Sequence, residues 1–224
     1  LKSDKPKVLY KINGKTLLEI LIKKFSNFSA KYCFVVSPKN KEIIQKELKK
    51  YKIIFKLVVQ NKPTGMADAI EICKSQIKTT HTIIIWGDQI GIKTKTIEKM
   101  IKISSKYKLV VATKRVFNPY IHFVRDNKNN VVSVLQKREG DIMPKIGEND
   151  AGIFIFKTKE LFLLYVKKDK VDIRGNITKE NNFIPLIIFF IKKFKSYYFY
   201  NKIDKIETIG LNYKKDAKYF IKKR

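Results

Sequence analysis

Apolar and polar positions change period repeatedly along the first half of the chain. Short apolar runs typical of buried strands occupy residues 32–37, 55–60, 82–86 and 108–115. Stretches with apolar residues three and four positions apart predict helices over residues 14–25, 38–50, 66–75 and 94–105. Strands that alternate with helices are typical of βα units around a parallel sheet, so the pattern predicts an α/β fold.

The rhythm changes after about residue 115. The pattern there predicts a hairpin around 124–132, strands at 152–156, 196–201 and 206–211, and helices at 159–167, 182–194 and 214–220. We find no internal repeat and no linker polar enough to divide the chain. We therefore expect one domain over 1–224, with a nucleotide half over about 1–115 and a second-substrate half over about 116–224.

Composition supports a folded core and raises the question of anionic partners. Hydrophobic residues make up 44% of the 224 positions, and the formal net charge is +29. Only five of the 49 basic residues are arginine, the side chain best suited to specific phosphate and base recognition, and the lysines are spread over all predicted helices. We expect solvated helix faces and no nucleic-acid partner; a basic nucleic-acid-binding protein is the alternative.

The same sequence bears on location. The most apolar window, residues 183–191, is about half the ~20 residues that a membrane helix needs, and it contains Pro185. No signal peptide is visible, and Cys33 and Cys73 are too far apart for a metal knuckle. We expect a cytoplasmic protein without a membrane span; its oligomeric state is open. Because the chain starts at Leu1 rather than Met, we expect its natural start to lie upstream.

Asp88 is the first candidate for chemistry. It closes the apolar run 82–86 through Gly87, and open α/β sheets bind ligands at the carboxyl ends of their strands. A glycine at that edge lets a phosphate or a cation approach the backbone. Asp88 is thus a candidate metal ligand, although an aspartate at a strand end is also an ordinary turn residue or helix cap.

Two further loops add charge and oxygen. Lys7 follows Pro6, which fixes the backbone and so presents a defined positive charge that can neutralise phosphate. Asn212 ends the Gly-Leu-Asn segment 210–212 and offers a neutral oxygen; it can equally cap the helix that follows. Because Mg²⁺ keeps waters and substrate phosphates as ligands, one Asp and one Asn are sufficient protein ligands.

A fourth loop joins the strand at 55–60 to the next helix. Gln60 can pair as donor and acceptor with a nucleobase edge, and Thr64 and Gly65 lead into a helix whose first amides can bind an anion. The alternative is a simple tight turn before a helix.

The order of these motifs resembles the sugar-1-phosphate nucleotidyltransferases, and most closely their N-acetylglucosamine-1-phosphate uridylyltransferase domain. The matching motifs are Ser3-Asp4-Lys5-Pro6-Lys7-Val8-Leu9, Gly14-Lys15-Thr16-Leu17, Gln60 with Gly65 and Ala69, Gly87-Asp88, the hairpin from Val124 to Gln136, Asp150 to Ile153, and Gly210-Leu211-Asn212. The match covers nearly the whole chain in the right order.

The resemblance implies a fold, a reaction and a site. The fold is the Rossmann-like nucleotide-diphospho-sugar transferase fold, a mixed, mostly parallel sheet flanked by helices. The reaction transfers a nucleotidyl group from an NTP, expected to be UTP, to a sugar 1-phosphate and releases pyrophosphate. Lys7 and Asp88 are the implied catalytic residues. Implied nucleotide ligands are Lys7, Gln60, Thr64, Gly65 and Gly87; sugar ligands are Gln136, Arg138, Asp150 and Gly152; and Mg²⁺ ligands are Asp88 and Asn212.

Some positions depart from that family. A Gly-x-Gly-Thr-Arg loop is expected immediately before Leu1, and the printed sequence starts after it. Gln136 stands where the uridylyltransferases have Glu, and Asp150 where they usually have Asn. These departures leave the sugar open. They also motivate an alternative, a non-catalytic domain on the same fold that senses nucleotides or sugar phosphates.

Overall fold

The structure is a computed structural model that describes residues 5–165, 172–212 and 214–221. Its strands are β1 (Lys11–Ile12), β2 (Lys15–Thr16), β3 (Tyr32–Val36), β4 (Phe55–Val59), β5 (His81–Ile85), β6 (Leu109–Phe117), β7 (Ile121–Arg125), β8 (Val131–Gln136), β9 (Ile146–Lys157) and β10 (Tyr197–Tyr200). Its α-helices are α1 (Leu17–Lys24), α2 (Lys41–Leu48), α3 (Met66–Glu71), α4 (Thr94–Ser104), α5 (Thr158–Tyr165) and α6 (Ile184–Phe194). Short 3₁₀ turns include η1 (Lys7–Leu9), η6 (Lys205–Thr208) and η7 (Lys214–Tyr219).

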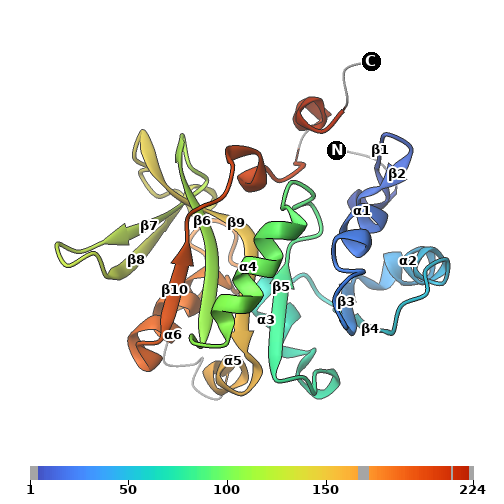
Figure 1. Ribbon diagram of the computed structural model, residues 1–224, viewed down its shortest axis with the longest axis horizontal. Coiled ribbons are helices and arrows are strands. Elements are labelled where there is room, and N and C mark those ends of the chain that lie inside the picture. The colour runs from blue at the N-terminus through green and yellow to red at the C-terminus, as the bar shows by residue number, and fades with distance from the viewer. Residues whose placement is uncertain (1–4, 166–171, 213, 222–224) are drawn as a thin grey trace.

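The main sheet has four strands in the order β10-β6-β9-β5 (Figure 1). β10 pairs parallel with β6, whereas β9 is antiparallel to both β5 and β6. Three strands therefore run one way and β9 runs the other. The predicted mixed sheet with helices on its faces is confirmed.

β3 and β4 form a separate parallel pair, in register from Tyr32 opposite Phe55 to Val36 opposite Val59. This pair stands apart from β5 in the ribbon view (Figure 1). All five residues of β3 are only half-buried, although they form an unbroken apolar run. Two of the four strands predicted in the first half, β3 and β4, are thus formed without a described ladder to the main sheet, whereas the other two, β5 and β6, belong to that sheet.

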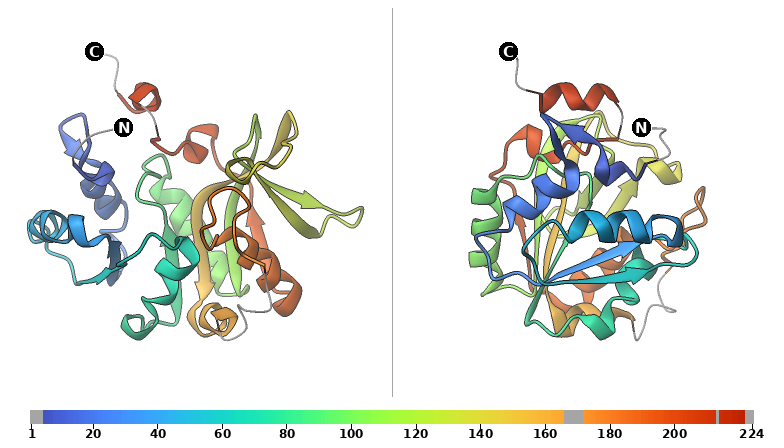
Figure 2. Two further views of the ribbon diagram at one scale, coloured as in Figure 1. Left: turned by 180° about the vertical axis from the view of Figure 1, so that it is seen from behind. Right: turned by 90° about the vertical axis from the view of Figure 1, so that its right-hand side faces the viewer.

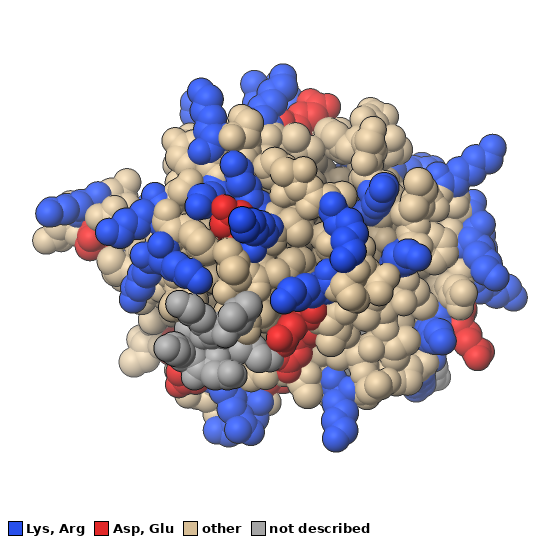
Figure 3. All heavy atoms as spheres, turned by 90° about the horizontal axis from the view of Figure 1, so that it is seen from below, with Lys and Arg blue, Asp and Glu red and all other residues tan. Residues whose placement is uncertain are grey.

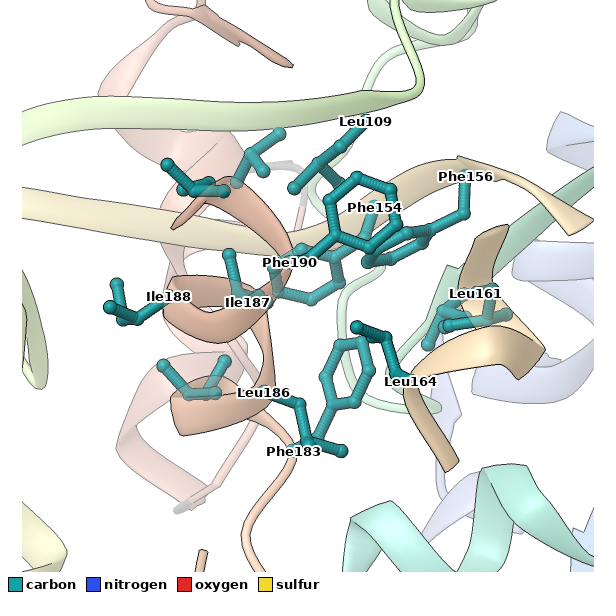
Figure 4. Packing of buried hydrophobic residues seen from close by; sticks show 14 of the residues in the cluster. Leu109, Phe154, Phe156, Leu161, Leu164, Phe183, Leu186, Ile187, Ile188 and Phe190 are labelled. Carbon is teal, nitrogen blue, oxygen red and sulfur yellow. The ribbon is translucent and has the colours of Figure 1, made fainter. Parts of the chain in front are cut away.

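The two faces of the main sheet carry different cores. On one face, Ile97 and Met100 of α4 pack with Val110, Ile153 and other aliphatic residues of β6 and β9. On the other face, α5 and α6 cover an aromatic core (Figure 4). Phe183 is at its centre, fully buried and edge-on to Phe154 and Phe156. Pro185 lies in the first turn of α6, where its missing N–H costs no helix bond.

The two ends of the described chain lie together above the sheet (Figure 2). The β1–β2 hairpin turns through Asn13 and Gly14, both with positive φ, and Thr16 then caps α1 by accepting a bond from the Glu19 amide at 3.0 Å. Ala217 of η7 packs with residues of this hairpin and helix, and Asn13 Nδ2 donates to the Phe220 carbonyl at 3.1 Å.

Most predicted elements are confirmed within a few residues, and three differ. The strand predicted at 206–211 is wrong, because Asp204 and Glu207 form a capping box that closes the turn η6, with Glu207 buried. The helix predicted from residue 14 is preceded by the β1–β2 hairpin. The strand predicted at 152–156 starts six residues earlier, at Ile146. The predicted helix at 159–167 is described only to Tyr165.

Among the described residues, no helix has the length and apolar character needed to cross a membrane.

Candidate functional site

Three loops that are distant in sequence meet at the end of β5. The Lys7 ammonium lies 2.5 Å from Asp88 Oδ2 and 2.8 Å from Asn212 Oδ1. Asp88 is partly buried, with its side chain 19% exposed, and Lys7 is more open at 34%. The structure therefore brings together the three residues that the sequence suggested for charge neutralisation and metal binding.

Local backbone contacts produce this convergence. The Leu211 amide donates to the Asp88 carbonyl at 3.1 Å, which holds the segment 210–212 beside the strand end. A Cβ on Gly87 would lie 2.8 Å from Val8 Cγ1, so a glycine is needed for η1 to approach. The Asn212 amide in turn donates to Asp216 Oδ2 at 2.9 Å. Residues from both ends of the chain are thereby fixed around one carboxylate.

The donor set fits a hard divalent cation. Asp88 and Asn212 already bind one cation, the Lys7 ammonium, through oxygen atoms. Two protein oxygens are too few to enclose Mg²⁺, but Mg²⁺ usually retains waters and substrate phosphate oxygens. Lys7 would then be released to a phosphate. The described residues contain no cluster of three or more His, Cys, Asp or Glu suited to a metal.

The turn after β4 is a closed structure. Gln60 Nε2 donates to the Gly65 carbonyl at 3.0 Å, and Gly65 has a φ of 121° that leads into α3. Asn181 lies directly against this turn: its amide donates to the Thr64 carbonyl at 2.7 Å and its carbonyl accepts from the Ala67 amide at 3.0 Å. A Cβ on Gly65 would come within 2.3 Å of the Asn181 carbonyl oxygen. The predicted base-binding turn is thus braced by a segment of the second half.

The predicted sugar-side residues divide into two groups. Asp150 and Gly152 of β9 lie beside the strand end that carries Asp88, because Trp86 N donates to the Gly152 carbonyl at 3.1 Å. Arg138 instead forms an ion pair with Glu180 at 2.8 Å, and the Gln136 amide donates to Asp141. The first pair adjoins the metal candidates, whereas Arg138 contacts the loop before α6 and Gln136 is paired with Asp141.

Burial shapes the chemistry of Asp150. Its side chain is 6% exposed, and Oδ1 accepts a hydrogen bond from the Gly152 amide at 2.6 Å. Burial, aided by the nearby negative charge of Asp88, raises the pKa of Asp150 to about 6 despite that bond. A second carboxylate therefore stands close to the Asp88 site.

Comparison with known families identifies the family of the chain. The family model described as the MobA-like NTP transferase domain matches residues 2–144, which is more than half of the chain. The chain belongs to the MobA-like NTP transferase family. The resemblance drawn from its motifs is thereby confirmed.

Known relatives agree with this assignment. The chain is 30% identical over 174 residues to the bifunctional protein GlmU of Buchnera aphidicola subsp. Acyrthosiphon pisum, covering 76% of this chain and 37% of that protein. The chain thus spans little more than a third of the length of that curated relative.

Solved structures share the fold. The nucleoside-diphosphate-sugar pyrophosphorylase of Vibrio cholerae matches with a TM-score of 0.74 at 14% identity, over 98% of this chain and 93% of that one. A putative glucose-1-phosphate thymidylyltransferase of Bacillus anthracis matches with a TM-score of 0.70 at 17% identity, over 89% of this chain and 79% of that one. The expected nucleotide-diphospho-sugar transferase fold is confirmed.

Sequence reasoning missed Glu139, the residue that organises the loop before α6. Glu139, 6% exposed, accepts hydrogen bonds from the Ile177 amide, the Thr178 amide and hydroxyl, and Asn182 Nδ2. Burial alone would raise the pKa of Glu139, but these bonds outweigh it and lower the pKa to about 2. No sequence signal marks this role, because the partners are about 40 positions away and the loop has no regular pattern.

A separate cavity of about 330 Å³ lies elsewhere on the molecule. Arg115, Arg125 and Tyr197 are among its lining residues, and none of the residues predicted for the site is. Arg125 is held there by Glu148 at 2.6 Å. The candidate ligands Lys7, Asp88 and Asn212 converge instead in the Asp88 region.

The large positive charge is dispersed on the face that Figure 3 shows. Lys and Arg side chains stand apart there, with neutral surface between them. This distribution is the one expected of solvated helix faces.

Proposed function

We propose that this protein transfers a nucleotidyl group from an NTP, with UTP the expected donor, to a sugar 1-phosphate, giving a nucleotide sugar and pyrophosphate. One observation carries the proposal: in a member of the MobA-like NTP transferase family, Lys7, Asp88 and Asn212 converge on one point at the end of β5. The names of the relatives, which include a nucleoside-diphosphate-sugar pyrophosphorylase, support the same class of reaction.

The reaction needs alignment and charge neutralisation more than a strong base. An oxygen of the sugar 1-phosphate attacks the α-phosphorus, the new P–O bond forms, and the bond to the bridging oxygen of the departing pyrophosphate breaks. Both reactants are anions, so the Lys7 ammonium lowers their mutual repulsion. When bound, Mg²⁺ would polarise the phosphate oxygens and offset the charge on the leaving group.

The surrounding residues supply orientation. In this proposal the braced turn of Gln60, Thr64 and Gly65 receives the base, and Gly87 lets the phosphates approach the backbone. Asp150 and Gly152 on β9 face the sugar, and Gln136 and Arg138 are its other proposed ligands. The residues of β9 and β5 are joined by main-chain bonds, which fixes the acceptor side relative to the Asp88 side.

The decisive assay is pyrophosphate release from NTP and sugar 1-phosphate with Mg²⁺, using the protein at its natural length. Asp88→Asn keeps the shape but removes the charge, and we expect kcat/KM to fall by about 100-fold or more, equivalent to roughly 3 kcal/mol of transition-state stabilisation. Asp126→Asn, in the exposed turn between β7 and β8, is the matched control and should leave turnover unchanged.

Unchanged turnover in Asp88→Asn would remove the metal assignment. A thermal-shift panel of NTPs and sugar phosphates with Mg²⁺ identifies the base and the sugar, because a ligand that binds only the folded state raises the melting temperature. Binding of an NTP without any pyrophosphate release would instead favour the sensing domain.

A further inference from the structure

Gln89 is a buried polar side chain that the proposed reaction does not use. It follows Asp88 directly, is 7% exposed, and its Oε1 has no hydrogen-bond partner among the described residues. Its backbone amide donates to the Trp86 carbonyl, which fixes the start of the side chain. Buried polar atoms are almost always paired, so an unpaired one beside a candidate metal ligand calls for a reason.

The Gln89 side chain fills the space between two glycines from different parts of the chain. A Cβ on Gly152 of β9 would lie 2.4 Å from Gln89 Cγ, so the stem of Gln89 occupies that position. A Cβ on Gly210 would lie 3.1 Å from Gln89 Nε2. Gln89 therefore spans from the acceptor-side strand to the loop that carries Asn212.

The amide end of Gln89 and both candidate metal ligands lie beside the same face of Gly210. The same point beside Gly210 lies 3.2 Å from Asn212 Nδ2 and 3.5 Å from Asp88 Cγ. Three polar side chains thus surround Gly210, and only Asp88 and Asn212 among them bind Lys7. Carboxylates and amides that bind a cation are themselves commonly held by an outer layer of polar groups.

We infer that Gln89 is a positioning residue: its amide holds the Asp88–Asn212 pair at the spacing that a divalent cation with its bound phosphates requires. This inference rests on the proposed function. The unpaired Oε1 then destabilises the protein without ligands, and Gln89 is retained because of its role when the cation and phosphates are bound. If Gln89 only filled space, no polar side chain would be needed, because an apolar side chain of the same length would fill this space at least as well.

The test replaces Gln89 with methionine, which keeps the length and removes the hydrogen-bonding atoms. Trp86, the only tryptophan, lies two residues from Asp88 and packs against Phe154 and Phe183, so its fluorescence reports binding without turnover. We titrate Mg²⁺ in the presence of UTP and record the fluorescence change, and we separately record the melting temperature of the metal-free protein. Gln76→Met, at an exposed glutamine of the turn before β5, is the matched control.

We expect Gln89→Met to raise the Mg²⁺ concentration for half-saturation by about 10-fold or more, while the metal-free melting temperature stays equal or rises. Gln76→Met should change neither quantity. An unchanged Mg²⁺ titration in Gln89→Met would overturn the inference, whatever happens to the melting temperature. If Gln89→Met does not fold, Gln89→Leu is held to the same criteria.

The two proposals fail in different ways. A wild-type protein with no Mg²⁺-dependent response to any NTP would overturn both the proposed function and the role of Gln89. A wild-type protein that responds and turns over, and whose Asp88→Asn variant is inactive while Gln89→Met titrates normally, would overturn the role of Gln89 alone.

Discussion

β3 and the second half of β9 are both apolar strand segments, yet they have very different surroundings. Eight consecutive residues of β9, from Asn149 to Phe156, are buried, whereas no residue of β3 is. β9 has β5 and β6 as neighbours and helices over both faces, while β3 has only β4 as a described ladder partner. The difference teaches that local sequence makes a strand, but the number of covering neighbours decides how much its side chains stabilise the fold.

The candidate site lies where these two kinds of structure meet. Asp150 and Gly152 belong to the deeply buried strand β9, and Gln60 follows the thin β3–β4 pair. Asn181 joins the two sides through its bonds to Thr64 and Ala67. We therefore expect the acceptor side to act as a rigid scaffold and the base side to depend on this brace.

The largest expected effect concerns stability and compares the aromatic core with the β3–β4 pair. Phe183→Ala removes a fully buried ring and should lower the free energy of unfolding by about 3 to 5 kcal/mol. Phe34→Ala, in half-buried β3, loses only part of the same contacts and should cost about half as much. Chemical denaturation of both variants measures the two values. Equal losses would show that β3 is as well packed as the aromatic core.

Glu139→Gln tests the hydrogen bonds that Glu139 accepts from residues 177, 178 and 182, called the Glu139 clamp, which hold the loop that carries Asn181. The pKa of Glu139 is lowered to about 2 in the folded protein from an ordinary value of 4.5. A lowered acid pKa contributes stability that is complete above pH 4.5 and is lost as the pH falls through 2. At 1.36 kcal/mol per pKa unit this is about 3 kcal/mol at neutral pH.

Unfolding free energies of the wild type and Glu139→Gln, measured from pH 7 to pH 2, should converge as the pH falls. A constant gap between the two over that range would mean that the charge of Glu139 contributes little. Glu139 holds the loop whose Asn181 lies against Gly65. The variant should therefore weaken NTP binding, while the packing of the aromatic core is affected less.

The smallest expected effect is at Asp150, where buried β9 lies beside the candidate site. The pKa of Asp150 is raised from 3.8 to about 6, so ionisation of Asp150 lowers the free energy of unfolding. This penalty is absent below pH 3.8 and complete above pH 6. Asp150→Asn keeps an oxygen for the Gly152 amide and removes the charge. We expect the free energy of unfolding to rise by about 1 to 3 kcal/mol at pH 7.5 and to change little at pH 4. A drop at pH 7.5 would show that the charge is stabilising.

Much of the fold could be predicted from the sequence because its signals are local. The apolar run at 82–86 predicts a strand, and the spacing of Ile97 and Met100 predicts a helix. Each signal lies within a few residues along the chain. The prediction for 206–211 was wrong because a short segment with several apolar residues resembles a strand, whereas the bonds of Asp204 and Glu207 close a turn instead. An apolar pattern does not record which polar side chain reaches which amide.

The sequence by itself determined the α/β alternation, the loops with chemistry and the family. Only the tertiary structure decided that Lys7, Asp88 and Asn212 share one point, that Glu139 clamps the loop near Gly65, and that Gln89 spans two glycines. The physical reason is distance along the chain. Propensity and periodicity act over a few residues, whereas these contacts join positions about 40 to 205 apart and exist only once the sheet and its helices have packed.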